Sequence, residues 1–309
     1  MKSNITVTPD DLQKCLDYPT EILETEYGPV EYGDHGKGAA ILSVHGGPGG
    51  YDQGLGVADM FRKAGFRIIA PSRPGYLNTP LDSGRSMEEQ ADLLASFLDA
   101  LELSEVVVLG VSAGGFSTYQ LAQRHPSIVS SLIEIDSVSI HYTKMQEISP
   151  LQEKIYLSKS GMAIATFFAD RFPRPVVKNI LSTESSLKDG DLKKRLTEIM
   201  EDPNKTAFVN FMVKTMSYKY DQRKAGLQND IEVLEALDEI PLSNIVCPTL
   251  IVHGTADTDV PLSHARYAAE SISGSDYYPI ESGSHLGFWT ARGAYEAQSF
   301  VVSWLNRHI

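Results

Sequence analysis

The sequence lacks the features that mark membrane-spanning, secreted and metal-dependent proteins. It contains no apolar run of about 18 residues, which argues against a transmembrane helix. Met1 to Thr20 has no apolar core of the kind that a secretory signal needs, so a cytoplasmic protein is predicted. The only two cysteines, Cys15 and Cys247, are expected to be free thiols. Neither HExxH nor paired CxxC spacing occurs, so no metal is predicted.

The sequence also contains fewer basic than acidic residues. The chain has 27 Lys and Arg against 40 Asp and Glu, which gives a net charge of −13. Such a surface repels nucleic acids and anionic membranes, and no basic run overturns this locally. The glycine-rich stretches match neither GxGxxG nor GxxxxGKS/T, so no nucleotide cofactor is expected. Neither a nucleic acid nor a membrane is therefore a predicted partner; a small-molecule substrate is predicted only from the motifs described below, and the oligomeric state leaves no readable trace.

What is present is a repeated alternation of strand and helix patterns over 309 residues, of which 42% are hydrophobic. This alternation predicts an α/β fold with a mostly parallel sheet covered by helices on both faces. Ser86 and Glu89 form a capping box that starts one clear amphipathic helix. Seven strands are predicted, near residues 28–32, 39–44, 66–70, 105–109, 131–135, 247–252 and 276–280.

The alternation stops between about residues 139 and 241, where the pattern is helical and no strand is convincing. We therefore expect an α/β core made of residues 1–138 and 242–309, with residues 139–241 inserted as a helical cap. Most apolar residues of this cap are expected to pack against one another.

The segment Gly110-Val111-Ser112-Ala113-Gly114 follows a predicted strand and precedes a predicted helix. Glycines around a serine at such a turn allow a tight, strained backbone that exposes the hydroxyl above the sheet, which is where a nucleophile would lie. Another glycine-rich loop, His45-Gly46-Gly47-Pro48-Gly49, closes an earlier strand, and its amides would face an oxyanion. Further on, Asp257 follows a buried strand and His285 lies on the loop after the last strand. The chain order is thus Ser, Asp, His.

These motifs resemble those of the α/β-hydrolase family, whose triad runs in this order. The resemblance covers nearly the whole chain, and HGGPG at positions 45–49 followed by GVSAG is similar to the branch of prolyl iminopeptidases and small esterases. It implies that Ser112 is the nucleophile, His285 the general base and Asp257 the acid that orients it. It also implies an oxyanion hole formed by the amide of Ala113 with that of Gly47 or Gly46.

Other residues compete for two of these roles. Asp259 lies on the same loop as Asp257, and Asp136 ends an earlier strand where some hydrolases carry their acid. His45 and His253 close strands just before glycines and are expected to orient loops through hydrogen bonds.

We predict hydrolysis of a carboxylic ester with a small or medium acyl chain, through an acyl-enzyme intermediate. An aminopeptidase acting on short peptides is the main alternative, although the cap contains no Trp and the loop at residues 71–76 departs from the peptidase pattern. Carbon–carbon bond hydrolysis, thioester hydrolysis and a non-catalytic ligand receptor on the same fold remain open.

Overall fold

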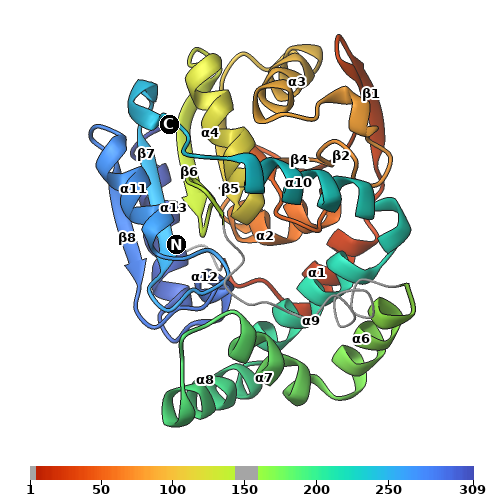
Figure 1. Cartoon of the computed structure of the whole chain (residues 1–309), viewed down its shortest axis with the longest axis vertical. Coiled ribbons are helices and arrows are strands. Elements are labelled where there is room, and N and C mark those ends of the chain that lie inside the picture. Colours follow the sequence, from red (N-terminus) through yellow and green to blue (C-terminus); the bar gives the residue numbers. More distant parts are fainter. Residues whose placement is uncertain (1–4, 143–158) are drawn as a thin grey trace.

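A single mixed sheet organises the molecule (Figure 1). The computed structural model describes residues 5–142 and 159–309. Its eight strands lie in the order β1-β2-β4-β3-β5-β6-β7-β8, with β1 and β2 antiparallel to their neighbours and the others parallel. The predicted fold class is thereby confirmed. The strands are β1 Glu21–Thr25, β2 Gly28–Gly36, β3 Ala40–Val44, β4 Arg67–Pro71, β5 Val106–Val111, β6 Val129–Ile135, β7 Thr249–Gly254 and β8 Asp276–Ile280.

Helices cover both faces of the sheet, because the central strands are buried on both sides. In β3, for example, Ile41 belongs to one buried cluster and Leu42 to the other, as the two-residue period of a strand requires. One face is covered by α1 Pro9–Leu16, α2 Tyr51–Lys63, α12 Gly287–Thr290 and α13 Ala294–Leu305. The other is covered by α3 Met87–Ala100, α4 Gly115–Arg124 and α11 Ser263–Ser271.

All seven predicted strands form, and the capping box is present at the start of α3, where the Ser86 hydroxyl accepts from the Glu89 amide at 3.2 Å. The strand β1 was not predicted. Its side chains are largely exposed, so it has no alternating apolar pattern. The strand is defined instead by its pairing with β2, in which Glu21 lies opposite Tyr32.

Between β6 and β7 the described residues form five α-helices, coloured green to teal in Figure 1. One of them, α9, packs against α1, α2 and α12, and Phe208 stacks on Trp289 with ring centroids 4.9 Å apart. Buried apolar contacts thus join α9 to the helices on one face of the sheet. The helices are α6 Lys159–Arg171, α7 Pro173–Thr183, α8 Asp189–Glu201, α9 Pro203–Ser217 and α10 Lys224–Ala236; four short 3₁₀ helices are η1 Leu81–Ser83, η2 Ser112–Gly114, η3 Tyr220–Gln222 and η4 Leu242–Asn244.

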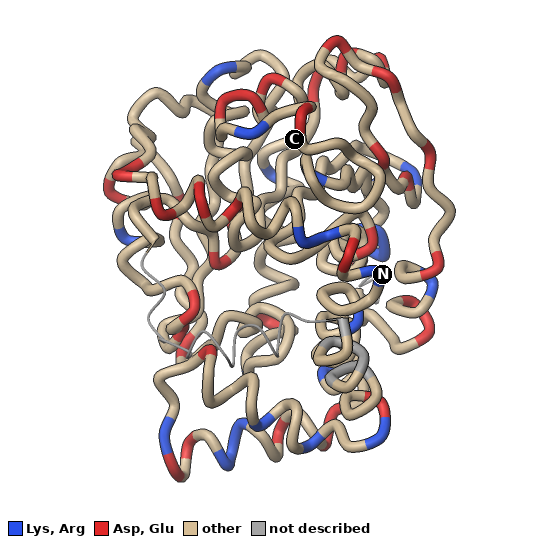
Figure 2. The backbone as a smooth tube through the Cα atoms, turned by 45° about the vertical axis from the view of Figure 1, so that its right-hand side comes forward, with Lys and Arg blue, Asp and Glu red and all other residues tan. Residues whose placement is uncertain are grey.

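Acidic positions are spread over the backbone with basic positions interspersed among them (Figure 2). Within the described part of the chain, no helix is long and apolar enough to cross a membrane. Cys15 and Cys247 are both free.

Candidate active site

Three side chains from separate segments meet at the carboxyl ends of β5, β7 and β8. The hydroxyl of Ser112, which follows β5, lies 3.0 Å from Nε2 of His285. The opposite ring nitrogen, Nδ1, lies 2.8 Å from Oδ2 of Asp257. In the neutral imidazole, Nδ1–H donates to the carboxylate and Nε2 accepts from the serine. The structure therefore brings together the three residues selected from the sequence.

Ser112 adopts a left-handed backbone conformation with φ of +54°, which is unfavourable for a residue with a side chain and is found where a function requires it. The turn is tight because the chain passes close to the end of β3. A Cβ atom on Gly114 would lie 2.6 Å from the carbonyl oxygen of Val44, so only glycine fits there. The glycine spacing of the motif thus has a direct steric cause.

Backbone amides hold the Asp257 carboxylate in position beside the imidazole. Its Oδ1 accepts from the amides of Asp259 and Val260 at 2.8 and 3.0 Å, which leaves Oδ2 for His285. Its competitor Asp136 accepts from the Gly254 amide at 2.8 Å and makes no hydrogen bond to His285. The geometry therefore favours Asp257 as the acid, with Asp136 buried behind it.

The imidazole of His285 lies among several carboxyl groups. Burial lowers its pKa, but the charges of Asp257 and Asp259 outweigh that effect and hold the pKa well above the ordinary value for histidine. Asp259 approaches from the solvent side, with Oδ2 3.5 Å from Nε2 and 42% of its side chain exposed. For Asp136, burial followed by the charge of Asp257 raises the pKa well above the usual range.

The amides expected to bind an oxyanion are not equivalent. The amide of Gly46 donates to Oε1 of Gln53 at 3.0 Å and is already used. Those of Gly47 and Ala113 donate to no group among the described residues. Ala113 lies in the first turn of a helix, where amides lack an intrahelical partner, and a Cβ on Gly47 would be 3.8 Å from that of Ala113. Gly47 and Ala113 are therefore the better-placed pair.

The remaining histidines that close strands form structural hydrogen bonds. His45 donates from Nδ1 to the Gly46 carbonyl at 2.6 Å and accepts from the Arg73 amide at Nε2. His253 donates to the Val260 carbonyl at 2.9 Å. Burial lowers the pKa of both, which keeps them neutral and suits this role.

One acidic residue beside the site was missed by the sequence reasoning. Glu184 directly follows α7, and its carbonyl accepts from the His285 amide at 3.4 Å. Its Oε2 is buried without a hydrogen-bond partner, and burial followed by the charge of Asp259 raises its pKa to about 8. No sequence signal marks it, because its position depends on how the insertion docks: Ser185 forms a β-bridge with Asp257.

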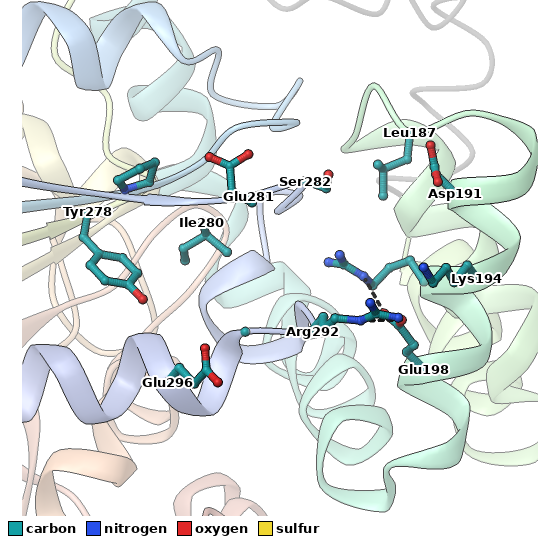
Figure 3. Close-up of a pocket in the computed structure, with 13 residues that line it drawn as sticks. Leu187, Asp191, Lys194, Glu198, Tyr278, Ile280, Glu281, Ser282, Arg292 and Glu296 are labelled. Atoms are coloured by element: carbon teal, nitrogen blue, oxygen red, sulfur yellow. Dashed lines mark hydrogen bonds and ion pairs between the residues drawn. The ribbon is translucent and has the colours of Figure 1, made fainter.

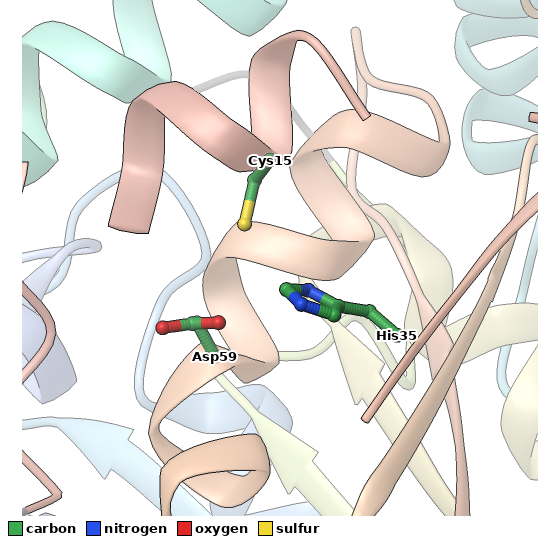
Figure 4. Close-up of side chains that lie close together, drawn as sticks. All are labelled: Cys15, His35 and Asp59. Atoms are coloured by element: carbon green, nitrogen blue, oxygen red, sulfur yellow. The ribbon is translucent and has the colours of Figure 1, made fainter. Parts of the chain in front are cut away.

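Two groups in the described part of the chain have the donor atoms for a metal ion. One is Asp136 with Asp257 and His285, in which Asp257 and His285 already use their facing atoms in the hydrogen bond between them. The other is Cys15, His35 and Asp59, which come from α1, β2 and α2 (Figure 4). There, burial and the nearby Asp59 raise the pKa of the Cys15 thiol, whereas a metal requires the thiolate. Both oxygens of Asp59 also accept from Arg62. Neither group therefore supports assigning a metal.

A cavity of about 460 Å³ lies between α8 and the segment from β8 to α13 (Figure 3). Its walls carry charges of both signs, and Arg292 pairs with Glu198 at 2.5 Å. Neither Ser112, Asp257 nor His285 lines this cavity. It lies apart from the hydrogen-bonded residues and does not define a substrate pocket for them.

Comparison with known proteins agrees with this fold. A family model described as "alpha/beta hydrolase fold" matches residues 39–291. The chain belongs to the α/β hydrolase fold family. It is similar over 93% of its length to an α/β hydrolase fold protein from Nakamurella multipartita, with 35% identity, 99% of that chain covered and a TM-score of 0.88.

Two curated relatives show how the family varies. An uncharacterised hydrolase of Bacillus subtilis, YcgS, is 28% identical over 93% of this chain and 98% of its own length. A 2-hydroxy-6-oxononadienedioate/2-hydroxy-6-oxononatrienedioate hydrolase of Escherichia coli is 23% identical over 90% of this chain and 91% of its own. The family supports a hydrolase and leaves the substrate open.

Proposed function

We propose that this protein is a serine hydrolase that cleaves a carboxylic ester of small or medium acyl chain. The observation that carries the proposal is the chain of hydrogen bonds from Ser112 through His285 to Asp257, with distances of 3.0 and 2.8 Å. A serine hydroxyl is a weak nucleophile until a neighbouring base removes its proton as attack begins. His285 is in position to do so, and Asp257 orients the ring and stabilises the imidazolium.

The proposed reaction has two halves. Ser112 Oγ attacks the ester carbonyl carbon while its proton moves to Nε2 of His285, and the carbonyl oxygen becomes an oxyanion held by the amides of Gly47 and Ala113. The tetrahedral intermediate then expels the alcohol, which takes the proton from His285. Water attacks the acyl-enzyme in the same way, so that the acid is released and Ser112 regains its proton.

We also propose that residues 139–241 form a cap over a core made of residues 1–138 and 242–309. The support is local: Ser185 bridges to Asp257, and the Thr258 amide donates to the Glu184 carbonyl at 3.3 Å. Since the cap contacts the loop that carries the acid, its helices are placed to influence which acyl groups enter. The free cysteines are consistent with the cytoplasm as the proposed location.

A panel of p-nitrophenyl esters from acetate to decanoate, run beside prolyl p-nitroanilide with wild type and Ser112→Ala, tests the proposal. We expect ester turnover that peaks at one chain length and is lost in the variant. Turnover that persists in folded Ser112→Ala, or a folded wild type inactive on every ester, would contradict it.

A second candidate function is an aminopeptidase, which one observation favours. Asp259 and Glu184 place two carboxyl groups beside His285, and a substrate with a free ammonium group would pair with Asp259 and lower the raised pKa of Glu184. Preference for the prolyl amide in the same panel would support this alternative. Carbon–carbon bond hydrolysis of a keto acid, the substrate class named for the Escherichia coli relative, remains a further alternative.

A further inference from the structure

The loop that carries the proposed oxyanion donor is held by buried side chains. Arg73 donates from Nε to the His45 carbonyl at 3.0 Å and from Nη2 to the Gly46 carbonyl at 3.3 Å. Gln53 accepts from the Gly46 amide and donates to the Pro48 carbonyl. Each of these bonds fixes the plane of one peptide unit.

The orientation of the peptide unit between Gly46 and Gly47 determines where the Gly47 N–H points. Its carbonyl and N–H point in opposite directions, because the unit is planar and trans. The carbonyl is held by Arg73 and by His45 Nδ1, so the Gly47 N–H is directed to the other side. The loop passes directly over the nucleophile there, since a Cβ on Gly46 would lie 2.9 Å from Cβ of Ser112.

Arg73 is itself held by a residue of the helical insertion. Asp230 on α10 accepts from both terminal nitrogens of Arg73, at 2.8 and 2.5 Å, and from the Tyr76 hydroxyl at 2.5 Å. The Arg73 and Asp230 side chains are only 1% and 3% exposed. A guanidinium buried this deeply requires a paired carboxylate, and the two-pronged pair fixes its plane as well as its charge.

We propose that Arg73 and Asp230 are positioning residues that orient the Gly47 amide toward the oxyanion. This inference rests on the proposed function and deepens it. It also makes the insertion part of the catalytic arrangement, because a helix of the insertion determines where Arg73 lies. A Cβ on Gly47 would meet Asp230 Oδ2 at 2.9 Å, so the carboxylate packs directly against the residue that it positions.

The test compares Arg73→Lys and Asp230→Asn with wild type. Lysine keeps the charge but lacks the planar fork that reaches Asp230 and two carbonyls together. The matched control is Arg67→Lys, which alters a more exposed pair with Asp34 at the start of β4. The readouts are kcat and KM on the best ester, the inhibition constant of an alkylboronic acid of matched chain length, and the thermal midpoint.

A missing oxyanion donor costs about 10²–10³-fold in kcat, so a misdirected one should cost about 10–100-fold. We expect that loss in Arg73→Lys, a smaller one in Asp230→Asn, and a KM close to wild type in both. The boronic acid forms a tetrahedral adduct, so its inhibition constant should rise by the same factor as kcat/KM falls. Arg67→Lys should keep wild-type values.

A folded Arg73→Lys enzyme with wild-type kcat would overturn the inference, as would a loss of kcat without weaker boronic acid binding. If the wild type turns over no ester, the proposed ester specificity fails instead. The rate of Ser112 phosphonylation by a p-nitrophenyl phosphonate then replaces kcat in the comparison. An unchanged rate in Arg73→Lys would still overturn the positioning role.

Discussion

Glu134 offers a quantitative test of the structure beneath the nucleophile. It lies in β6, is 1% exposed, and accepts from the Thr118 hydroxyl at 2.6 Å. The same hydroxyl lies 3.2 Å from the carbonyl of Gly114 in the serine turn. Burial raises the pKa of Glu134 from 4.5 to about 8, although the hydroxyl groups of Ser137 and Thr118 oppose this. The carboxyl group is therefore neutral in the folded protein at pH 7.

The sign of the effect on stability follows from proton linkage. Between pH 4.5 and about 8 the folded state keeps a proton that the unfolded state has lost, so the free energy of unfolding falls as the pH rises. Within this range the free energy of unfolding falls by about 1.4 kcal/mol per pH unit. The total loss caused by Glu134, which we call its cost, is then about 1 kcal/mol at pH 5, about 3 kcal/mol at pH 7 and about 5 kcal/mol at pH 9. Above the folded-state pKa the cost is constant.

The substitution Glu134→Gln removes this cost and keeps an oxygen that accepts from Thr118. Urea unfolding of both proteins at pH 5, 7 and 9 gives the difference in unfolding free energy, variant minus wild type. This difference should grow by about 4 kcal/mol across the range. The other buried carboxyl groups with raised pKa values, Asp136 and Glu184, are present in both proteins and cancel.

The control is Glu105→Gln, at an exposed position just before β5, which should change stability by at most about 0.5 kcal/mol. Any constant effect of the amide in Glu134→Gln shifts the difference equally at all three pH values. A difference that stays the same from pH 5 to pH 9 would refute the reasoning, because it would mean that Glu134 binds no extra proton in the folded state.

Three further predictions concern the site. Asp259→Asn removes a charge that raises the pKa of His285, so the acidic limb of the kcat/KM profile should move to lower pH; an unmoved limb would contradict the electrostatic assignment. Asp257→Asn should lower kcat by ~10⁴ in steady-state assays, and a loss below tenfold would mean that another carboxylate serves. Gly46→Ala places a Cβ 2.9 Å from that of Ser112, so kcat should fall by about 10²-fold as the reacting groups separate. A wild-type kcat in this variant would show that the loop can move away from Ser112 without affecting catalysis.

Much of the fold was predictable because buried strands and capped helices carry local signals. The apolar run before Ser112 became β5, and Ser86 capped α3 as predicted. The strand β1 was missed because its stability depends on pairing with β2, to which its own exposed residues give no clue. Local pattern therefore identified the elements with an apolar face and failed at the sheet edge.

The residues of the site also divide into those that local sequence identifies and those that it does not. Ser112, Asp257 and His285 were found because each follows a strand in a recognisable loop, and parallel strands bring such loops to one edge of the sheet. Glu184 and Asp230 belong to the insertion, and their approach to the site depends on long-range docking. Nothing in the local sequence around Asp230 indicates that it pairs with a residue 157 positions earlier.

The central claim is that Ser112 is a nucleophile activated by His285. The most direct measurement is intact-protein and peptide mass spectrometry after reaction with a p-nitrophenyl phosphonate, for wild type, Ser112→Ala and His285→Ala. We predict one adduct per wild-type chain, located on Ser112, none in Ser112→Ala, and much slower labelling in His285→Ala. A folded wild-type protein that remains unlabelled, or an adduct on a different residue, would contradict the account.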